Sequence, residues 1–183
     1  GNFIRIATKY FSFEHCKRIE EIMQANPESF SDDEFMDLSN LLSEKGDKEK
    51  SFAILEKLAE RGYAFANIRL ADYYQRQGDA EKSFACIKKA WEAKKTDSFY
   101  ALRYAKALLA RKASEGDMKT AFDLFRFAQS ENREALIWIS YCYENGYGIE
   151  KNSEKSKEYL DKAIAFGENA ADLRSIGNGL IKG

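Results

Sequence analysis

The chain has 183 residues, of which 44% are hydrophobic and 32% are charged, and its formal net charge at pH 7 is −1. This balance excludes the long-range attraction that strongly basic proteins exert on nucleic acids and anionic membranes. A single proline and the wealth of alanine, glutamate, lysine and leucine favour helices throughout. No run of 18 apolar residues occurs, so no segment is predicted to span a bilayer.

The N-terminal part of the chain predicts one incomplete helix pair. Residues 13–26 form a helical pattern that ends before Pro27, and residues 3–11 place apolar side chains on one helical face. The apolar stretch Phe3–Phe13 needs a cover, so self-association of two copies through this end is one hypothesis. Ser31 and Glu34 then form a capping box, which predicts the start of the next helix.

From residue 31 onward, one pattern occurs four times and predicts stacked helix pairs. The second helix of each pair carries a small residue, followed four residues later by a large apolar one. The small residues are Ser51, Ser83, Ala121 and Ser156, and the large ones are Leu55, Ile87, Phe125 and Leu160. Recurrence at intervals of 32 to 38 residues is typical of solenoid repeats.

The first helix of each pair carries a small residue of its own. These residues are Ser39, Ala71, Ala105 and Ser140. Each is expected to let the two helices of its pair approach closely, because side chains at the contact set the distance between helix axes. The predicted cap of the second helix comes 8 positions after this small residue in the first two pairs and 12 positions after it in the last two. We therefore expect a longer turn in the last two pairs.

Polar residues and glycines mark the turns between the paired helices. Predicted caps of the second helices are Asp47, Asp79, Asp117 and Asn152, and predicted left-handed ends of the first helices are Gly46, Gly78 and Gly116. Residues 168–182 begin a further first helix, which Gly177 and Gly179 weaken by about 1 kcal/mol each relative to alanine. The predicted boundaries are 1–30 for a partial unit, 31–63, 64–96, 97–131 and 132–167 for four full units, and 168–183 for a C-terminal cap or truncated unit.

Two segments of this array resemble known repeat families. The spacing of Ala71, Ser83, Ile87 and Ala90 matches the tetratricopeptide pattern, and residues 135–167 resemble a Sel-one-like repeat. The most distinctive element is the turn Tyr-Glu-Asn-Gly-Tyr-Gly-Ile-Glu-Lys-Asn at residues 143–152. The resemblance implies an all-α, right-handed solenoid of antiparallel helix hairpins. It also implies a non-enzymatic scaffold or adaptor, bacterial or eukaryotic, that binds a peptide or partner helix in a concave groove.

The resemblance further implies which residues line that groove, because in tetratricopeptide proteins the residue after the small residue of the first helix often points into it. The residues at this position, or one helical turn further on, are Asn40, Asp72, Gln75, Lys106, Leu109, Tyr141 and Glu144. An alternative hypothesis is a cell-envelope assembly factor that associates with polysaccharide or peptidoglycan. Exposed Trp138 and Tyr141 side chains would favour this alternative, and burial of Trp138 would weaken it.

The sequence predicts no catalytic residue, metal site or cofactor. His15 is the only histidine, so nucleophilic and metal sites that depend on histidine pairs lack their second member. The three cysteines, Cys16, Cys86 and Cys142, are far apart and are interpreted as buried apolar residues. The expected partners are protein or peptide segments, without nucleic acid or membrane insertion. The compartment stays open between the cytoplasm and, with an upstream signal removed, the periplasm.

Overall fold

The computed structural model describes residues 12–111 and 114–166, and all regular secondary structure within these ranges is helical. Three predictions lie outside the residues whose side chains are described. They are the helix at 3–11, the helix at 168–182 and the apolar contact through Phe3–Phe13. The elements are α2 (Phe13–Ala25), the 3₁₀ helix η1 (Pro27–Ser29), α3 (Asp32–Glu44), α4 (Lys48–Glu60), α5 (Ala64–Arg76), α6 (Ala80–Ala93), α7 (Ser98–Arg111), α8 (Glu115–Ala128), α9 (Arg133–Asn145) and α10 (Ser153–Phe166). The chain divides into two compact units, residues 1–93 and 94–183.

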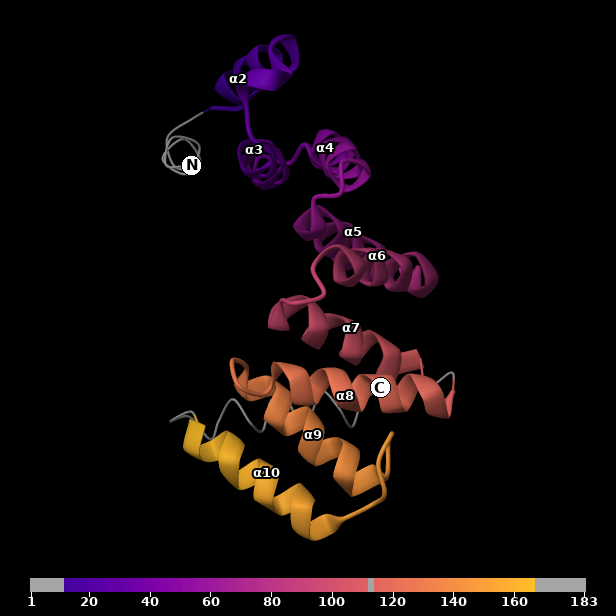
Figure 1. Ribbon diagram of the computed structural model, residues 1–183. Helices are drawn as coiled ribbons and strands as arrows, with labels where there is room; N and C mark the ends of the chain where they lie inside the picture. The colour runs from indigo at the N-terminus through magenta and orange to yellow at the C-terminus, as the bar shows by residue number, and fades with distance from the viewer. Residues whose placement is uncertain (1–11, 112–113, 167–183) are drawn as a thin grey trace. The chain divides into compact units, whose positions relative to one another are not determined.

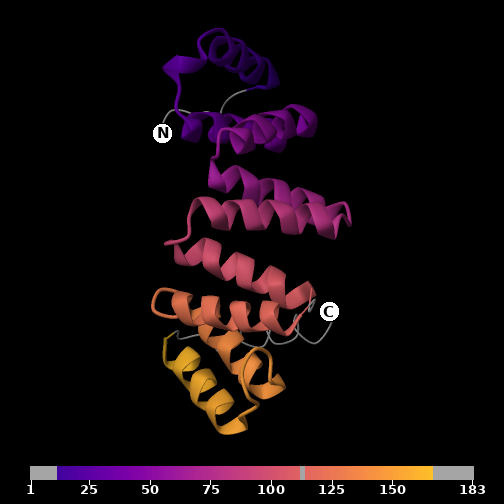
Figure 2. The ribbon, with the colours of Figure 1, turned by 45° about the vertical axis from the view of Figure 1, so that its right-hand side comes forward.

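In the first unit, short turns join α3 to α4 and α5 to α6, and the helices of each pair lie side by side (Figures 1 and 2). Helix α4 also packs on α5, so that each pair covers apolar surface of the other. Leu55 and Leu58 of α4 share one buried cluster with Met36 of α3 and with Ala66 and Leu70 of α5. Burial of each such leucine contributes about 1.5–3 kcal/mol, so contact between pairs is a major source of stability.

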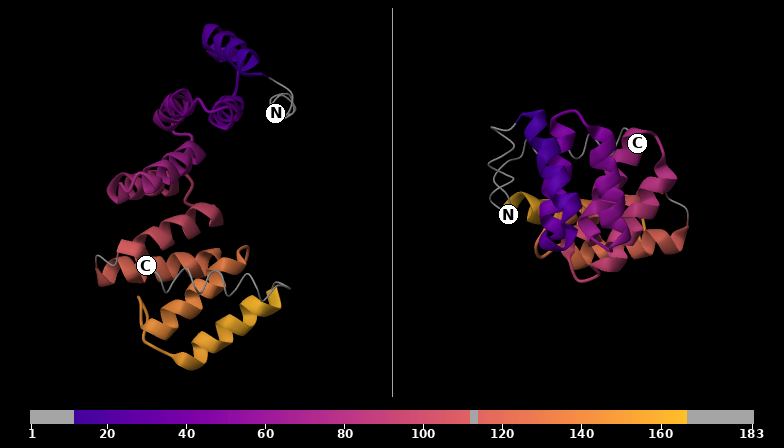
Figure 3. Two further views of the ribbon diagram at one scale, coloured as in Figure 1. Left: turned by 180° about the vertical axis from the view of Figure 1, so that it is seen from behind. Right: turned by 90° about the horizontal axis from the view of Figure 1, so that it is seen from above.

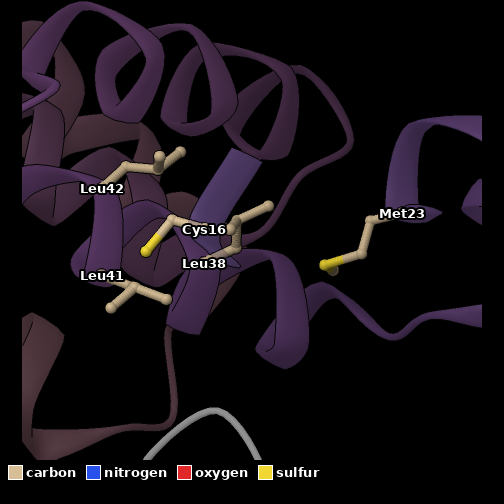
Figure 4. Packing of buried hydrophobic residues seen from close by; sticks show 5 residues of the cluster. All are labelled: Cys16, Met23, Leu38, Leu41 and Leu42. Carbon is tan, nitrogen blue, oxygen red and sulfur yellow. The ribbon is translucent and has the colours of Figure 1, made fainter. Parts of the chain in front are cut away.

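Helix α2 adds a further layer to the first unit. Cys16 and Met23 of α2 lie in one buried cluster with Leu38, Leu41 and Leu42 of α3 (Figure 4). Cys16 and Met23 are seven residues apart, which places them on the same helical face two turns apart. Helix α2 therefore packs on α3 as α4 packs on α5, which confirms the prediction of a helix over residues 13–26.

The second unit repeats this arrangement. Helices α7 and α8 form one pair, α9 and α10 form another, and α8 packs on α9 (Figure 3). Phe125 of α8 is fully buried, whereas Leu160, which occupies the same repeat position on α10, is 39% exposed. The difference follows from position, because no helix among the described residues comes after α10 to cover Leu160.

Small residues occupy the place where the two helices of each pair meet. All eight of the small residues identified from the repeat pattern are buried. In the first pair, Oγ of Ser39 donates to the backbone oxygen of Ser51 at 3.1 Å and lies 2.9 Å from Oγ of Ser51. Ser140 and Ser156 repeat this geometry at 2.7 and 3.0 Å. The hydroxyl groups thus satisfy one another's hydrogen bonds where the two helices touch. Larger side chains at these positions would hold the helices apart.

Most of the predicted helix ends are confirmed. The side chains of Asp47, Asp79 and Asn152 each accept a hydrogen bond from the backbone N–H three residues later. Ser31 and Glu34 form the predicted capping box, with the Ser31 N–H donating to Oε2 of Glu34 at 2.8 Å. Gly46 and Gly78, at the ends of the first helices, have the positive φ angles expected of left-handed residues.

The third pair departs from the prediction in three ways. Ser114, not Asp117, caps α8, because its Oγ accepts a hydrogen bond from the Asp117 N–H at 3.0 Å. Gly116 therefore lies inside the first turn of α8 and does not adopt a positive φ angle. The turn predicted to be longer is short, since α7 runs to Arg111 and α8 begins at Glu115. The extra residues lengthen α8 at its start, because Ser114 offers a cap three residues earlier.

The long turn after α9 depends on two glycines with positive φ angles, Gly146 at 73° and Gly148 at 69°. A Cβ atom on Gly148 would collide with the backbone of Met118 and Lys119 in α8, whereas a Cβ atom on Gly146 would meet its neighbours at ordinary distances of 3.6 Å or more. The turn therefore lies directly against α8, and only a glycine at position 148 permits that approach.

We expect Ala105→Leu to destabilise the second unit. Ala105 is fully buried where α7 meets α8, so a leucine must push the helices apart, at a cost of about 1–3 kcal/mol. Urea unfolding followed by circular dichroism measures this cost. Ala110→Leu on the same helix is the matched control, because Ala110 is exposed and its substitution should stay within about 0.5 kcal/mol. Equal midpoints for the two variants would contradict close helix contact at Ala105.

We expect Gly148→Ala to cost more stability than Gly146→Ala in the same turn. Both alanines must adopt a left-handed conformation, which costs about 1–2 kcal/mol, but only the one at 148 also collides with α8. The collision should add about 1–3 kcal/mol. Urea midpoints of the two variants compare these costs, and a Gly146→Ala loss equal to or larger than that of Gly148→Ala would rule out the close approach.

Candidate functional site

The first helices of the second unit bring a lysine, a glutamate and a tryptophan together. Lys106 of α7 extends toward α9, where its Nζ lies 2.6 Å from Oε1 of Glu134. The same oxygen accepts a hydrogen bond from Nε1 of Trp138, one turn further along α9, at 3.1 Å. The Lys106 Nζ also lies 5.7 Å from the centroid of the Trp138 ring, within cation–π range. One carboxylate oxygen thus positions both a cation and an indole.

Trp138 begins a row of aromatic side chains. Its ring stacks on Phe125 of α8 with an interplanar angle of 9° and a centroid separation of 5.5 Å. Tyr141 meets the Trp138 ring edge to face, and Tyr147, in the turn after α9, lies 5.7 Å from Tyr141 between ring centroids. Trp138, Tyr141 and Tyr147 are each half-buried. The row therefore offers part of each ring to solvent, while the contacts between rings limit their freedom to rotate.

The neighbours of Glu134 keep its carboxylate ionised. Burial raises the pKa of Glu134, but the hydrogen bond and charge of Lys106, the Trp138 N–H and the charge of Arg103 together outweigh burial. The resulting pKa lies below the ordinary value for glutamate. The Lys106–Glu134 ion pair is therefore maintained at neutral pH.

The first unit uses the same repeat positions for a different pair of residues. Asn40 of α3 and Lys106 of α7 each follow the small residue of their helix. Oδ1 of Asn40 accepts a hydrogen bond from Nη2 of Arg69 on α5 at 3.2 Å. Arg69 and Trp138 each lie two positions before the small residue of their own helix. In each unit, therefore, the residue that follows the small residue of one first helix contacts the next first helix. The contacted residue lies two positions before the small residue of that next helix.

The remaining residues predicted to line the groove differ in exposure. Gln75 and Glu144 are exposed, and Asp72 and Tyr141 are half-buried. Leu109 is only 2% exposed, so its side chain belongs to the core and is not available to a partner in this structure. Its position along the helix favoured the groove, but an aliphatic side chain gains more from burial against neighbouring helices.

Three residues of this surface were missed by the sequence analysis, namely Arg69, Glu134 and Tyr147. A signal for the first two exists in the spacing of complementary residues. Asn40 and Arg69 are 29 residues apart, and Lys106 and Glu134 are 28 apart. Both spacings are slightly shorter than one repeat, which is the separation expected for residues that face each other on successive first helices.

The residues considered for chemistry have structural roles. The lone histidine, His15, closes a capping box at the start of α2, with its Nδ1 2.7 Å from Oγ of Ser12. Burial raises the pKa of the Cys142 thiol to about 12, so this thiol is protonated and weakly nucleophilic at neutral pH. Cys16 is also buried, and Cys86 is half-buried. Within residues 12–111 and 114–166, no group of three or more His, Cys, Asp or Glu residues is arranged to hold a metal ion.

None of the helices in the described part of the chain is both long enough and apolar enough to cross a bilayer.

No protein-family model and no curated protein sequence matches the chain. Solved structures do match. A Sel1 repeat protein from Oxalobacter formigenes has a TM-score of 0.69 at 16% sequence identity, and the match covers 90% of this chain and 68% of that protein. A protective antigen of uropathogenic Escherichia coli, described as having an SLR fold, has a TM-score of 0.65 at 23% identity. That match covers 87% of this chain but 36% of the antigen, so the chain spans about a third of that protein.

The chain has the Sel-one-like (Sel1) repeat fold. The predictions of an all-α solenoid class and of a resemblance to Sel-one-like and tetratricopeptide repeats are thereby confirmed.

We expect Glu134→Gln to lower stability at neutral pH by about 1 kcal/mol, because the exchange removes a partly exposed ion pair. The folded pKa of Glu134 lies below the ordinary value of 4.5, so its stabilisation is complete above that pH and is lost as the pH falls through the folded pKa. Urea midpoints of wild type and variant should differ at pH 7, and the difference should shrink as the pH falls below 4.5. Glu144→Gln, on the same helix but exposed, is the control, and a pH-independent difference for Glu134→Gln would contradict the ion-pair mechanism.

Proposed function

We propose that this chain is a non-enzymatic interaction scaffold that holds an extended peptide or a partner helix against its first helices. The observation that carries the proposal is the half-buried aromatic row of Trp138, Tyr141 and Tyr147 beside the Lys106–Glu134 ion pair. Large aromatic side chains supply most of the energy at the centres of protein interfaces, and charged groups nearby set the register of the partner. This combination suits a peptide with one or two apolar anchors.

The aromatic row is organised before any partner arrives. Stacking on Phe125 and the hydrogen bond to Glu134 hold the Trp138 ring, and Tyr141 is held in turn against Trp138. A side chain that is already ordered loses little conformational entropy when a partner binds. Binding of a partner at these rings therefore loses little affinity to the ordering of their side chains.

Polar residues on the first helices add the second element of the proposal. In the second unit, Glu144 is exposed one turn beyond Tyr141. In the first unit, Asn40, Asp72 and Gln75 offer amide and carboxylate groups on α3 and α5. We assign these residues to polar registration of the partner, since hydrogen bonds at a rim fix orientation and contribute less to affinity than buried anchors.

The alternative is association with polysaccharide or peptidoglycan. The position of Trp138 supports this alternative less than it supports the scaffold. One face of its ring is covered by Phe125, and its N–H is engaged by Glu134. A sugar that stacks on this ring would have at most the opposite face and an edge available. A peptide side chain needs less of the ring, which favours the scaffold.

We expect the triple variant Asp72→Ala, Lys106→Ala, Tyr141→Ala to lose its protein partners in quantitative co-purification from native lysate. A matched variant with the same kinds of side chain removed from second helices is Glu56→Ala, Lys89→Ala, Phe127→Ala, at three exposed positions. The matched variant should retain the partners. Circular dichroism establishes that both variants are folded.

A photoreactive benzoylphenylalanine in place of Tyr147 tests the location directly, because it should cross-link the proteins that the triple variant loses. If the triple variant retains the same proteins as wild type, or if the probe at 147 cross-links none of them, the partner does not bind at this face and the proposed function fails.

A further inference from the structure

A buried glutamate occupies a repeat position at which the other second helices carry large apolar residues. Cys16 and Met23 of α2 correspond to Ser51 and Leu58 of α4, and on this alignment Glu20 corresponds to Leu55. Leu55 and its counterpart on α8, Phe125, are 7% and 0% exposed. Glu20 is likewise buried, at 9% exposure. A carboxylate therefore stands where the repeat pattern calls for an aliphatic or aromatic side chain.

The Glu20 carboxylate is held by two neighbours. Its Oε2 lies 2.7 Å from Nζ of Lys50 on α4, and its Oε1 accepts a hydrogen bond from Nε2 of Gln24 at 2.9 Å. The Lys50 side chain is 42% exposed, whereas that of Glu20 is 12% exposed. The anion is thus fixed in the interior, while its cationic partner reaches in from solvent. Burying such a pair usually stabilises a protein less than an apolar residue of the same size would.

Glu20 lines a cavity of about 640 Å³ within the first unit. Phe35 and Leu38 of α3 and Ile54 and Leu58 of α4 form its apolar wall, so the cavity lies among α2, α3 and α4. A cavity of this size that combines an apolar wall with convergent polar groups is typical of a ligand-binding site. The polar groups on its α2 side are Glu20 and Gln24, and three charged residues that follow Leu55, namely Lys57, Glu60 and Arg61, line its mouth.

We propose that this cavity receives an arginine side chain from a peptide segment of a partner protein. The aliphatic stem would lie along the half-buried side chains of Phe35 and Ile54, and the guanidinium group would bind the Glu20 carboxylate in place of the Lys50 ammonium. Arginine fits this arrangement better than lysine, because its planar group donates two parallel hydrogen bonds to a carboxylate and is less strongly hydrated. Long cationic side chains regularly bury their stems in this way.

The charges at the mouth of the cavity are compatible with a cationic ligand. Arg61 also lines the cavity, but its Nη2 lies 2.9 Å from Oδ1 of Asp32, which balances its charge. Lys57 and Glu60, three residues apart on α4, contribute one charge of each sign. The mouth therefore carries no net positive charge to repel a guanidinium group, and Glu20 provides an anion inside.

This site is separate from the proposed face on the first helices. None of the seven residues predicted for the groove lines the cavity, and neither does Trp138 or Tyr147. The two sites therefore fail or succeed independently, and one experiment distinguishes them.

The test is a titration of the full chain, labelled at isoleucine and leucine methyl groups, with n-butylguanidinium and with n-butanol as its uncharged counterpart. We expect saturable shifts of the Ile54, Leu38 and Leu58 methyl signals with butylguanidinium and at least ten-fold weaker binding of butanol. A blocked alanine peptide with one central arginine should bind more tightly than butylguanidinium, and the same peptide with glutamine should not bind. Absence of saturable shifts, equal binding of butanol, or an arginine peptide that binds more weakly than butylguanidinium overturns the proposal.

Substitutions of Glu20 and Lys50 identify the recognition group. Glu20→Leu restores the apolar residue of the other repeats, so it should remain folded and lose at least ten-fold in butylguanidinium affinity. Glu20→Gln should lose a similar factor, whereas Lys50→Met removes the competing cation and should bind several-fold more tightly. The triple variant of the first helices should bind butylguanidinium like wild type. Unchanged binding by both Glu20 variants, or loss of binding in the triple variant, contradicts the assignment.

Discussion

The contact between small residues inside each helix pair is the constraint on which the rest of the structure depends. Where Ser39 meets Ser51, and Ser140 meets Ser156, the helices approach closely enough for one hydroxyl to bond the other and its backbone carbonyl. A fixed contact point fixes the rotation of each helix about its axis. It therefore decides which side chains face the next pair, which face the partner helix, and which reach solvent. A shift of this contact would change which residues of the first helices are exposed.

Stability and surface recognition share residues as a consequence. The position after the small residue of a first helix holds Asn40 in one unit and Lys106 in the other, and both reach the following first helix. These side chains join successive pairs, and they also form the surface that the proposed partner meets. Because stability in repeat proteins is approximately a sum over neighbouring units, the loss of one such pair weakens a single junction. The surface can therefore vary from repeat to repeat, as the change from Asn40–Arg69 to Lys106–Trp138 illustrates.

The sequence predicts the elements whose cause is local and loses accuracy where the cause lies in another part of the chain. The caps at Asp47, Asp79 and Asn152 and the small residues at helix contacts follow from short patterns, and they are confirmed. The third pair was predicted wrongly because Ser114 and Asp117 are both good caps, and the local pattern does not rank them. Burial of Leu109 and the pairing of Lys106 with Glu134 depend on neighbouring helices, so spacing within one helix does not reveal them.

Glu20 shows how a repeat array can accommodate a costly residue. A buried carboxylate with a single lysine partner is weaker packing than the leucine or phenylalanine at the same position in α4 or α8. In a globular core this deficit would act on the whole fold, whereas here it acts mainly on the junction of α2 with α3. The buried cluster of Cys16, Met23 and three leucines beside it maintains that junction. An array of this kind can carry a polar group and an open cavity in one repeat, because each repeat contacts only its neighbours and the deficit is confined to that junction.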